Sequence, residues 1–411
     1  MKMVTKWKTL KVADLGRVVT GKTPPTGRTE LMGDVYPFIT PTDIGDYRDC
    51  TPVRHLSEEG RTSQRNLLLP AKTVCVTCIA SVGKMCMTSS PSFTNQQINS
   101  IIVNEEKHDP SFVYYLLKTR VEHLKAIAGG AATPIINKSS FSEVEVRVPE
   151  LPTQRKIAGI LSVYDDLIEN NLSRIKILEE MAQSLYREWF VHFRFPGHES
   201  TKFVDSALGQ IPKGWGITDL EKVTTKIGSG ATPRGGKDSY QTDGITLIRS
   251  MNIYDYSFEF DNLAFIDPKQ AAQLENVSVE ARDVLLNITG ASVCRCAMVP
   301  SYLLPARVNQ HVAIIRANID LMDPHFLLDS INSEQNKRTL FSLAQGGATR
   351  EALTKETICR FKILLPPRDL VFRYGRIADA MHTQREGLQR KSQVLRRTRD
   401  LLLPQLLQGK T

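Results

Sequence analysis

The sequence predicts a mixed α/β (α+β) protein in which two similar α/β modules are separated by two long helices that form an antiparallel coiled coil. Three observations carry this prediction. Two stretches have the heptad spacing of coiled-coil helices, a set of short motifs occurs twice in the same order, and each copy mixes strand-like with helix-like segments. We therefore expect an internal repeat with pseudo-twofold symmetry.

The composition is that of an ordinary globular protein. The 411 residues are 41% hydrophobic and 24% charged, and such a length normally gives about two or three domains. No apolar run of about 18 residues is present and the N-terminus lacks the apolar core of a signal peptide, which argues against a membrane or secreted protein. Seven cysteines are typical of reduced thiols, so we expect a cytoplasmic protein. The net charge of +9 favours a polyanionic partner, although a basic helix face is more often simply solvated.

The first long helix is expected from Gln154 to about His192. Its inward positions alternate in steps of four and three residues, which is the spacing of a coiled-coil seam. These positions are Ile157, Leu161, Tyr164, Ile168, Asn171, Ile175, Leu178, Ala182, Leu185 and Trp189.

The second long helix is expected from about Arg373 to Gly409. Its seam positions lie 220 residues further along the chain, at Ile377, Met381, Gln384, Leu388, Lys391, Leu395, Thr398 and Leu402. Lys391 stands where the first helix has Asn171, and polar residues in a seam fix register and partner. Each helix would be roughly 50 Å long, and two such helices in one chain most simply pack against each other.

The rest of the chain contains two copies of one module. The repeated motifs are Gly21-Lys22-Thr23-Pro24 and Gly230-Ala231-Thr232-Pro233, Asn95-Gln96 and Asn309-Gln310, Asp109-Pro110 and Asp323-Pro324, and Gly129-Gly130-Ala131 and Gly346-Gly347-Ala348. The stretch Ala80-Ser81-Val82-Gly83-Lys84 recurs as Ala291-Ser292-Val293-Cys294-Arg295, with cysteine in place of glycine. The order of the motifs is the same in both copies, which indicates a duplication.

Each module is expected to contain buried strands and a capped helix. Short apolar runs predict strands at 74–80, 100–103 and 143–148 in the first copy, and at 284–288, 312–315 and 360–365 in the second. Asp109 and Asp323 are expected to cap helices that begin with the following proline. The resulting boundaries are 1–150 for the first module, 151–192 for the first helix, 193–214 for a linker, 215–367 for the second module and 368–411 for the second helix.

The order of these motifs resembles the specificity subunit of type I restriction–modification systems over essentially the whole chain. Further residues that carry the resemblance are Leu151-Pro152-Thr153-Gln154, Glu188-Trp189-Phe190-Val191, the segment from Leu208 to Trp215, and the segment from Leu403 to Lys410. The second copy departs from the pattern at Cys294 and at Arg373-Tyr374-Gly375, which replaces the glutamine at the start of the first helix.

The resemblance implies a non-catalytic subunit with two target-recognition domains, each reading a short half-site of double-stranded DNA. The gap between the half-sites would be set by the coiled coil. Two methylation subunits would dock on the helices and modules, and restriction subunits would lie beyond them. S-adenosylmethionine, ATP and magnesium are implied for those partner subunits, and no cofactor or metal is expected to bind this chain.

Motifs for catalysis are weak in this sequence. The chain has no G-x-x-x-x-G-K-[ST] nucleotide loop, and Leu365-Pro366-Pro367-Arg368 is not the tetrad of an amino-methyltransferase. Glu105-Glu106-Lys107 lies in a charged turn and not in a nuclease-like setting. Cys75 and Cys78 have the spacing of a zinc knuckle, but residues three apart in a strand point to opposite faces, so buried free thiols are favoured.

DNA recognition needs cations for phosphates and planar amide or guanidinium groups for base edges. In the first module the candidates are Lys22, Thr23, Thr40, Thr42, Asp43, Lys84, Asn95, Gln96, Thr133 and Lys138. In the second module they are Thr232, Arg234, Arg249, Asn252, Arg295, Asn309, Gln310, His311, Thr349, Arg350 and Lys355. Several have a structural alternative, because Asn95 and Gln96 could satisfy backbone groups in a buried turn, and Thr40 or Asp43 could cap a local helix.

Two alternative functions stay open. The chain could serve a related enzyme in which restriction and methylation activities are fused, with the same DNA-reading role. It could also be a coiled-coil scaffold that binds proteins without sequence-specific DNA contact. The duplicated loop motifs and the basic charge, which is in excess between Arg373 and Lys410, favour DNA reading over the scaffold.

Overall fold

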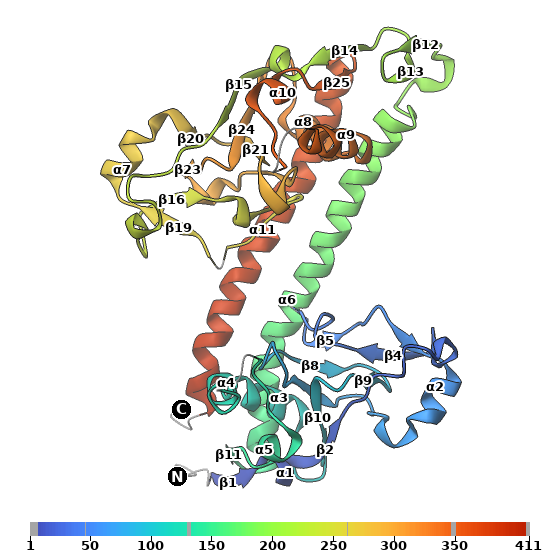
Figure 1. The fold of residues 1–411 in the computed structure, drawn as a ribbon, viewed down its shortest axis with the longest axis vertical. Helices are drawn as coiled ribbons and strands as arrows, with labels where there is room; N and C mark the ends of the chain where they lie inside the picture. Colours follow the sequence, from blue (N-terminus) through green and yellow to red (C-terminus); the bar gives the residue numbers. More distant parts are fainter. Residues whose placement is uncertain (1–6, 46, 130–132, 261, 347–350, 408–411) are drawn as a thin grey trace. The chain divides into compact units, whose positions relative to one another are not determined.

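The computed structural model describes residues 7–45, 47–129, 133–260, 262–346 and 351–407. The chain divides into two compact units (Figure 1). The first unit comprises Met1–Ser173 with Gln389–Thr411, and the second comprises Arg174–Leu388. Each unit therefore contains one module and parts of both long helices.

The first unit is a mixed α/β module followed by the start of a long helix. Its strands are β1 (Lys8–Lys11), β2 (Gly16–Thr20), β3 (Met32–Gly33), β4 (Tyr36–Ile39), β5 (Asp49–Cys50), β6 (His55–Leu56), β7 (Val74–Thr77), β8 (Met85–Thr88), β9 (Phe93–Thr94), β10 (Ile98–Val103) and β11 (Glu145–Val148). Its helices are α1 (Val12–Leu15), α2 (Glu58–Ser63), α3 (Pro110–Lys118), α4 (Val121–Ile127), α5 (Lys138–Ser142) and the long α6 (Leu151–Tyr186), which extends beyond the unit.

The second unit has the same kinds of element. Its strands are β12 (Phe203–Ser206), β13 (Gly209–Pro212), β14 (Gly216–Asp219), β15 (Thr224–Ser229), β16 (Ile245–Ile248), β17 (Ile253–Tyr254), β18 (Ser257–Phe258), β19 (Ala264–Ile266), β20 (Ser278–Val279), β21 (Val284–Asn287), β22 (Cys296–Met298), β23 (Ala306–Val308), β24 (Val312–Ala317) and β25 (Lys362–Leu365). Its helices are α7 (Pro268–Gln273), α8 (Pro324–Asn332), α9 (Glu334–Gln345), α10 (Lys355–Cys359) and the long α11 (Arg368–Leu407), whose end belongs to the first unit.

The sheet topology repeats between the units. In the first unit the order is β2-β10-β7-β8-β5 in one sheet and β3-β6-β4-β9 in a second. The second unit has β15-β24-β21-β22 and β19-β16-β23-β20, and both β4–β9 and β16–β23 are parallel pairs. A short pair, β1-β11 or β14-β25, joins the start of each module to its last strand. The predicted mixed α/β repeat is therefore confirmed.

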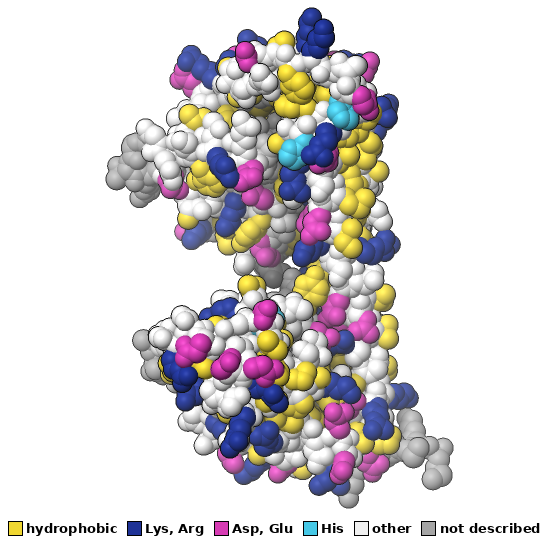
Figure 2. All heavy atoms as spheres, turned by 90° about the vertical axis from the view of Figure 1, so that its right-hand side faces the viewer, with side chains coloured by type: hydrophobic (Ala, Val, Ile, Leu, Met, Phe, Trp, Pro, Cys, Tyr) yellow, Lys and Arg dark blue, Asp and Glu magenta, His cyan; other side chains and the backbone are white. Residues whose placement is uncertain are grey.

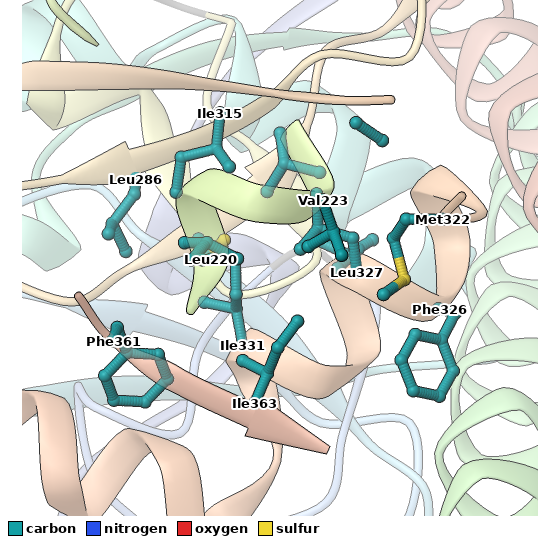
Figure 3. Packing of buried hydrophobic residues seen from close by; sticks show 14 of the residues in the cluster. Leu220, Val223, Leu286, Ile315, Met322, Phe326, Leu327, Ile331, Phe361 and Ile363 are labelled. Atoms are coloured by element: carbon teal, nitrogen blue, oxygen red, sulfur yellow. The ribbon is translucent and has the colours of Figure 1, made fainter. Parts of the chain in front are cut away.

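In the second module, the buried helix α8 covers the sheet β15-β24-β21-β22. Phe326, Leu327 and Ile331 of α8 pack with Leu286 of β21 and Ile315 of β24 (Figure 3). The helix begins as predicted, because the Asp323 Oδ1 atom accepts a hydrogen bond from the His325 backbone N–H at 2.8 Å and Pro324 takes the first helical position.

The segment 193–214 is more ordered than its Gly, Pro and polar composition suggests. It contains the hairpin β12–β13. Phe193 and Phe195 contact the buried Trp215, with ring centroids 5.5 and 5.1 Å away. The aromatic residues thus attach this segment to the second module.

The long helices pack together in an antiparallel manner within both units. In the first unit Leu161 of α6 shares a core with Leu403 and Leu407 near the end of α11. In the second unit Trp189, just beyond α6 in a π-helical turn, shares a core with Tyr374 near the start of α11. The predicted pairing of the two helices is therefore confirmed.

The seam of α6 follows the predicted spacing closely. Ile157, Leu161, Ile168, Asn171 and Ile175 are buried, as are Ala182 and Trp189, while Tyr164, Leu178 and Leu185 are half-buried. Asp165 and Tyr186, which directly follow Tyr164 and Leu185 in the sequence, are buried.

The seam of α11 was predicted wrongly at three of its eight positions, and Thr398 is half-buried. Met381 and Leu388 are buried, and Leu395 and Leu402 are half-buried, but Ile377 is 41% exposed. Gln384 and Lys391 are exposed too, and the residues one step later, Ala378, Arg385 and Ser392, are buried instead. The spacing of apolar residues did not identify this buried face of α11, because Arg385 and Ser392 are polar.

No helix in the part of the chain that the structure describes combines the length and apolar character needed to cross a lipid bilayer.

Candidate nucleic-acid interface

In each module, the Gly-x-Thr-Pro motif near the start lies beside the Asn-Gln motif that precedes strand β10 or β24. In the first unit the Gly21 N–H donates to the Ile98 carbonyl at 3.2 Å, and the Lys22 N–H donates to the Thr94 carbonyl at 2.9 Å. A Cβ atom on Gly21 would lie 2.2 Å from the Thr94 carbonyl oxygen, so only glycine permits this approach. The Thr23 hydroxyl donates to Gln96 Oε1 at 2.5 Å, which brings two of the predicted DNA-binding residues together.

The second unit repeats this arrangement. The Gly230 N–H donates to the Val312 carbonyl at 2.8 Å, and a Cβ atom on Gly230 would lie 2.1 Å from the Val308 carbonyl oxygen. The Thr232 hydroxyl donates to Gln310 Oε1. The motif pairs found in the sequence thus form one contact in each module.

Buried asparagines hold the loop that presents these glutamines. Asn95 Oδ1 accepts the Gln97 N–H at 3.1 Å, and Asn309 Oδ1 accepts the His311 N–H at 3.2 Å. Both asparagines are more than nine-tenths buried. Their amides therefore serve the turn, which is the structural alternative that the sequence left open.

A second turn uses another predicted pair in each module. Asp43 Oδ2 accepts the Thr40 N–H at 2.7 Å, and Asn252 Oδ1 accepts the Arg249 N–H at 3.0 Å. The Thr40 hydroxyl also donates to Asp43 Oδ2 at 2.7 Å. These polar groups stabilise the loops after β4 and β16, and the hydroxyl of the exposed Thr42 lies 2.9 Å from the Thr40 hydroxyl in the same turn.

A tight turn after β7 or β21 places a cation at the same point of each module. The Gly83 N–H donates to the Thr77 carbonyl at 2.9 Å, and the Cys294 N–H donates to the Asn287 carbonyl at 2.8 Å. Gly83 has φ +93° and Cys294 has φ +67°, so the cysteine that replaces the glycine keeps its left-handed conformation. Lys84 and Arg295 follow directly, and the turn fixes where their side chains begin.

A surface groove of about 700 Å³ lies beside this turn in the second unit. Arg295 lines the groove and its guanidinium carbon lies 4.3 Å from the centroid of the Tyr254 ring. His311 lines the groove as well, with Nδ1 2.7 Å from the Thr289 hydroxyl. Tyr254 and Thr289 were not among the predicted residues, because nothing in the repeat marks them.

The chain is similar to known proteins of one family. The sequence model of the family described as "Type I restriction modification DNA specificity domain" matches residues 5–180. The chain is 29% identical to the MjaIX type I restriction enzyme specificity subunit of Methanocaldococcus jannaschii, over 99% of this chain and 94% of that protein. The chain is therefore similar over nearly its whole length to type I restriction–modification specificity subunits, and residues 5–180 match the DNA specificity domain of that family.

One further relative and one solved structure are also similar to this chain. The HindI specificity subunit of Haemophilus influenzae is 37% identical over 181 residues, which cover 42% of this chain and 39% of that protein. The crystal structure of the type I restriction–modification system S subunit from M. genitalium has the same fold, with a TM-score of 0.65 and 16% identity over 99% of this chain and 97% of that chain.

The predicted DNA-binding residues differ in exposure. Those that are exposed are Lys22, Thr42, Lys84, Gln96, Thr133, Lys138, Thr232, Arg234, Gln310 and Lys355. Those that are half-buried are Thr23, Asp43, Arg249, Arg295 and His311, whereas Thr40, Asn95, Asn252 and Asn309 are buried. Thr349 and Arg350 lie outside the described residues.

Positive side chains do not form one uniform patch on the face shown in Figure 2, where Lys and Arg are interspersed with Asp and Glu. Charge alone therefore does not mark the DNA interface, and the repeated loops carry the argument.

Cys75 and Cys78, which have the spacing of a zinc knuckle, do not form one cluster in the described part of the chain. Cys75 and Cys78 lie in different core clusters, as the strand geometry predicted. Burial raises the pKa of the Cys78 thiol to about 11, which disfavours the thiolate that a metal needs. Among the described residues, no group of three or more metal-ligating side chains is found.

Proposed function

We propose that this chain is the subunit that reads DNA sequence in a type I restriction–modification complex, and that each module recognises one half of a bipartite target. One observation carries the proposal. The two modules share one hydrogen-bonded loop frame, built by Gly21, Thr23 and Asn95 or by Gly230, Thr232 and Asn309. A duplicated frame that presents different exposed side chains suits the recognition of two different half-sites.

The two long helices are proposed to set the length of the unread gap between the half-sites. α6 has 36 residues and α11 has 40, which correspond to roughly 50–60 Å of helix. Packed helices of this length resist bending, so the number of residues in them limits the gap.

Methylation subunits are proposed to dock on the exposed apolar side of α6. In the first unit Val163 is 56% exposed and Leu167 is 49% exposed, and in the second unit Ile177 and Met181 are each 54% exposed. Such residues at helical spacing on a solvent-facing side are typical of a partner interface. Restriction subunits would join through that assembly.

The chemistry of the complex is proposed to lie in the partner subunits. S-adenosylmethionine would donate the methyl group, and ATP with magnesium would drive translocation and cleavage. This chain would hold the target in register, take part in no bond-making step, and bind none of these cofactors.

Selection from a random duplex library tests the proposal. The chain would be purified with its methylation subunits, and bound DNA would be sequenced after several rounds. We expect enrichment of two short specified elements separated by a fixed number of unspecified base pairs. Enrichment of no sequence would favour the scaffold function, and one continuous element would contradict reading by two modules.

A further inference from the structure

We infer that Arg295, supported by the ring of Tyr254, is a specificity-determining residue that reads a guanine in the half-site of the second module. The inference rests on the proposed function and deepens it, because it assigns one base to one side chain. Three features carry it: a loop frame that both modules share, a difference between the side chains that the two modules place on this frame, and the geometry of the Arg295 guanidinium group.

The loop frame around this position is the same in both modules. The Asn95 N–H donates to the Ile39 carbonyl at 3.1 Å, and the Asn309 N–H donates to the Ile248 carbonyl at 3.0 Å. The Ile136 N–H donates to the Cys78 carbonyl at 2.8 Å, and the Leu353 N–H donates to the Ile288 carbonyl, also at 2.8 Å. Loops held this similarly place equivalent positions at equivalent points, so a difference in reading must come from the side chains they carry.

The side chains differ most where the groove of the second unit lies. Lys84 corresponds to Arg295, and Gly45, which follows the buried Ile44, corresponds to Tyr254, which follows the buried Ile253. The second module therefore pairs an arginine with an aromatic ring where the first has a lysine and a glycine.

The backbone and the side chain of Arg295 are both restrained. The Arg295 N–H donates to the Ser292 carbonyl at 3.2 Å, and its carbonyl accepts the Asn287 N–H at 2.8 Å. The guanidinium carbon lies 4.3 Å from the centroid of the Tyr254 ring. A guanidinium group that stacks on a ring loses little conformational freedom on binding, which favours a directional contact over a diffuse one.

The chemistry of a restrained arginine selects guanine. Its two parallel N–H groups match the N7 and O6 acceptors on the major-groove edge of guanine, whereas adenine presents an acceptor and a donor there. His311 is fixed by the contact of its Nδ1 atom with the Thr289 hydroxyl at 2.7 Å, which leaves its other ring nitrogen for a neighbouring base or phosphate. Lys84 in the first module is a point charge without this fork geometry.

Library selection with matched variants tests the inference. The chain with its methylation subunits would be compared as wild type, Arg295→Ala, Arg295→Lys, Tyr254→Leu and Lys84→Ala. We expect Arg295→Ala and Arg295→Lys to reduce the preference for guanine at one position of one half-site by about tenfold to a hundredfold. Tyr254→Leu should weaken the same position less, and Lys84→Ala should affect only the other half-site.

The possible outcomes separate this inference from the function on which it rests. A bipartite motif that is unchanged in Arg295→Lys, or a uniform loss of affinity at all positions, would overturn the guanine contact while keeping the proposed function. A wild-type complex that selects no motif would overturn both. Arg295→Lys keeps the charge and the length of the side chain, so it decides the question even if Arg295→Ala fails to fold.

Discussion

We expect the buried residue Asp329 to make the stability of the second unit depend on pH. Asp329 of α8 is buried, and the Tyr374 hydroxyl donates to its Oδ2 atom at 2.5 Å. Burial raises the pKa of the Asp329 carboxyl to about 7, compared with about 3.9 in an unfolded chain. The folded state therefore binds more protons than the unfolded state between these two values, and the free energy of unfolding falls as the pH rises through that window.

Replacement of Asp329 by asparagine should remove this dependence. Asp329→Asn stays neutral at every pH, so its free energy of unfolding should fall less than that of the wild type between pH 5 and pH 7. The difference should be at most about 1.4 kcal/mol per pH unit. Denaturant unfolding of the purified chain at several pH values measures it. Equal pH dependence of the wild type and Asp329→Asn would show that Asp329 is ionised in the fold.

Tyr374→Phe is the matched variant for that experiment. The Tyr374 hydroxyl lowers the pKa of Asp329 by hydrogen bonding to the charged form. Loss of the hydroxyl should therefore raise that pKa further, and the decline in stability should continue to a higher pH than in the wild type.

At the scale of elements, a buried ion pair links the two long helices in the first unit. Arg399 of α11 donates from Nη1 to Asp165 Oδ1 of α6 at 2.5 Å, and the Tyr115 hydroxyl donates to Asp165 Oδ2 at 2.6 Å. The side chain of Asp165 is 5% exposed and that of Arg399 is 13% exposed. Removal of one partner leaves a buried charge, which costs more than loss of the pair as a whole.

Arg399→Ala is expected to destabilise the first unit by about 3–5 kcal/mol. The double variant Asp165→Leu with Arg399→Leu should recover part of that loss, because it leaves no unpaired charge. Arg397→Ala is the control, since Arg397 is exposed on the same turn of α11, and surface substitutions usually change stability by less than about 0.5 kcal/mol. Thermal unfolding of the chain compares the three. Equal effects of Arg399→Ala and Arg397→Ala would contradict a structural role for the pair.

Element types were predictable from the sequence where apolar spacing and capping agreed. The strands at 74–80 and 284–288 and the helix that Asp323 caps are present as predicted. The seam of α11 was missed at Ala378, Arg385 and Ser392, because a buried arginine or serine does not register in an apolar pattern. The contact between Thr23 and Gln96 joins residues 73 apart. The repeated motifs identified both residues as candidates, but their contact became visible only in the structure.

The exposed side of α6 leads to a prediction about assembly. Leu167→Glu should leave the thermal stability of the chain nearly unchanged, because Leu167 is 49% exposed. It should weaken association with the methylation subunit by at least about tenfold if that side is the interface, as expected for a charge placed in an apolar contact. Affinity of the purified partners measures this. Lys176→Glu is the control, because Lys176 is exposed on the same helix and points about 180° away from Leu167.

For the molecule as a whole, duplication within one chain replaces dimerisation. Proteins that read two half-sites are commonly symmetric dimers, whose spacing follows from the dimer interface. Here the two modules share a frame but differ at Lys84 and Arg295, and at Gly45 and Tyr254. If each module reads one half-site as proposed, a single chain recognises two unlike half-sites, with α6 and α11 in place of a dimer interface.

The role of the two helices can be tested by changing their length. Insertion of seven residues after Ser173 in α6 and after Leu388 in α11 leaves each compact unit intact, because these are the boundaries between the units. A heptad preserves the seam register and adds about 10.5 Å of helix. Because base pairs are about 3.4 Å apart along DNA, the gap in the selected target should grow by at most three base pairs while both half-sites stay the same. An insertion in α6 alone is the control and should impair target binding, since it mismatches the two helices; altered half-sites with an unchanged gap would show that the helices do not set the spacing.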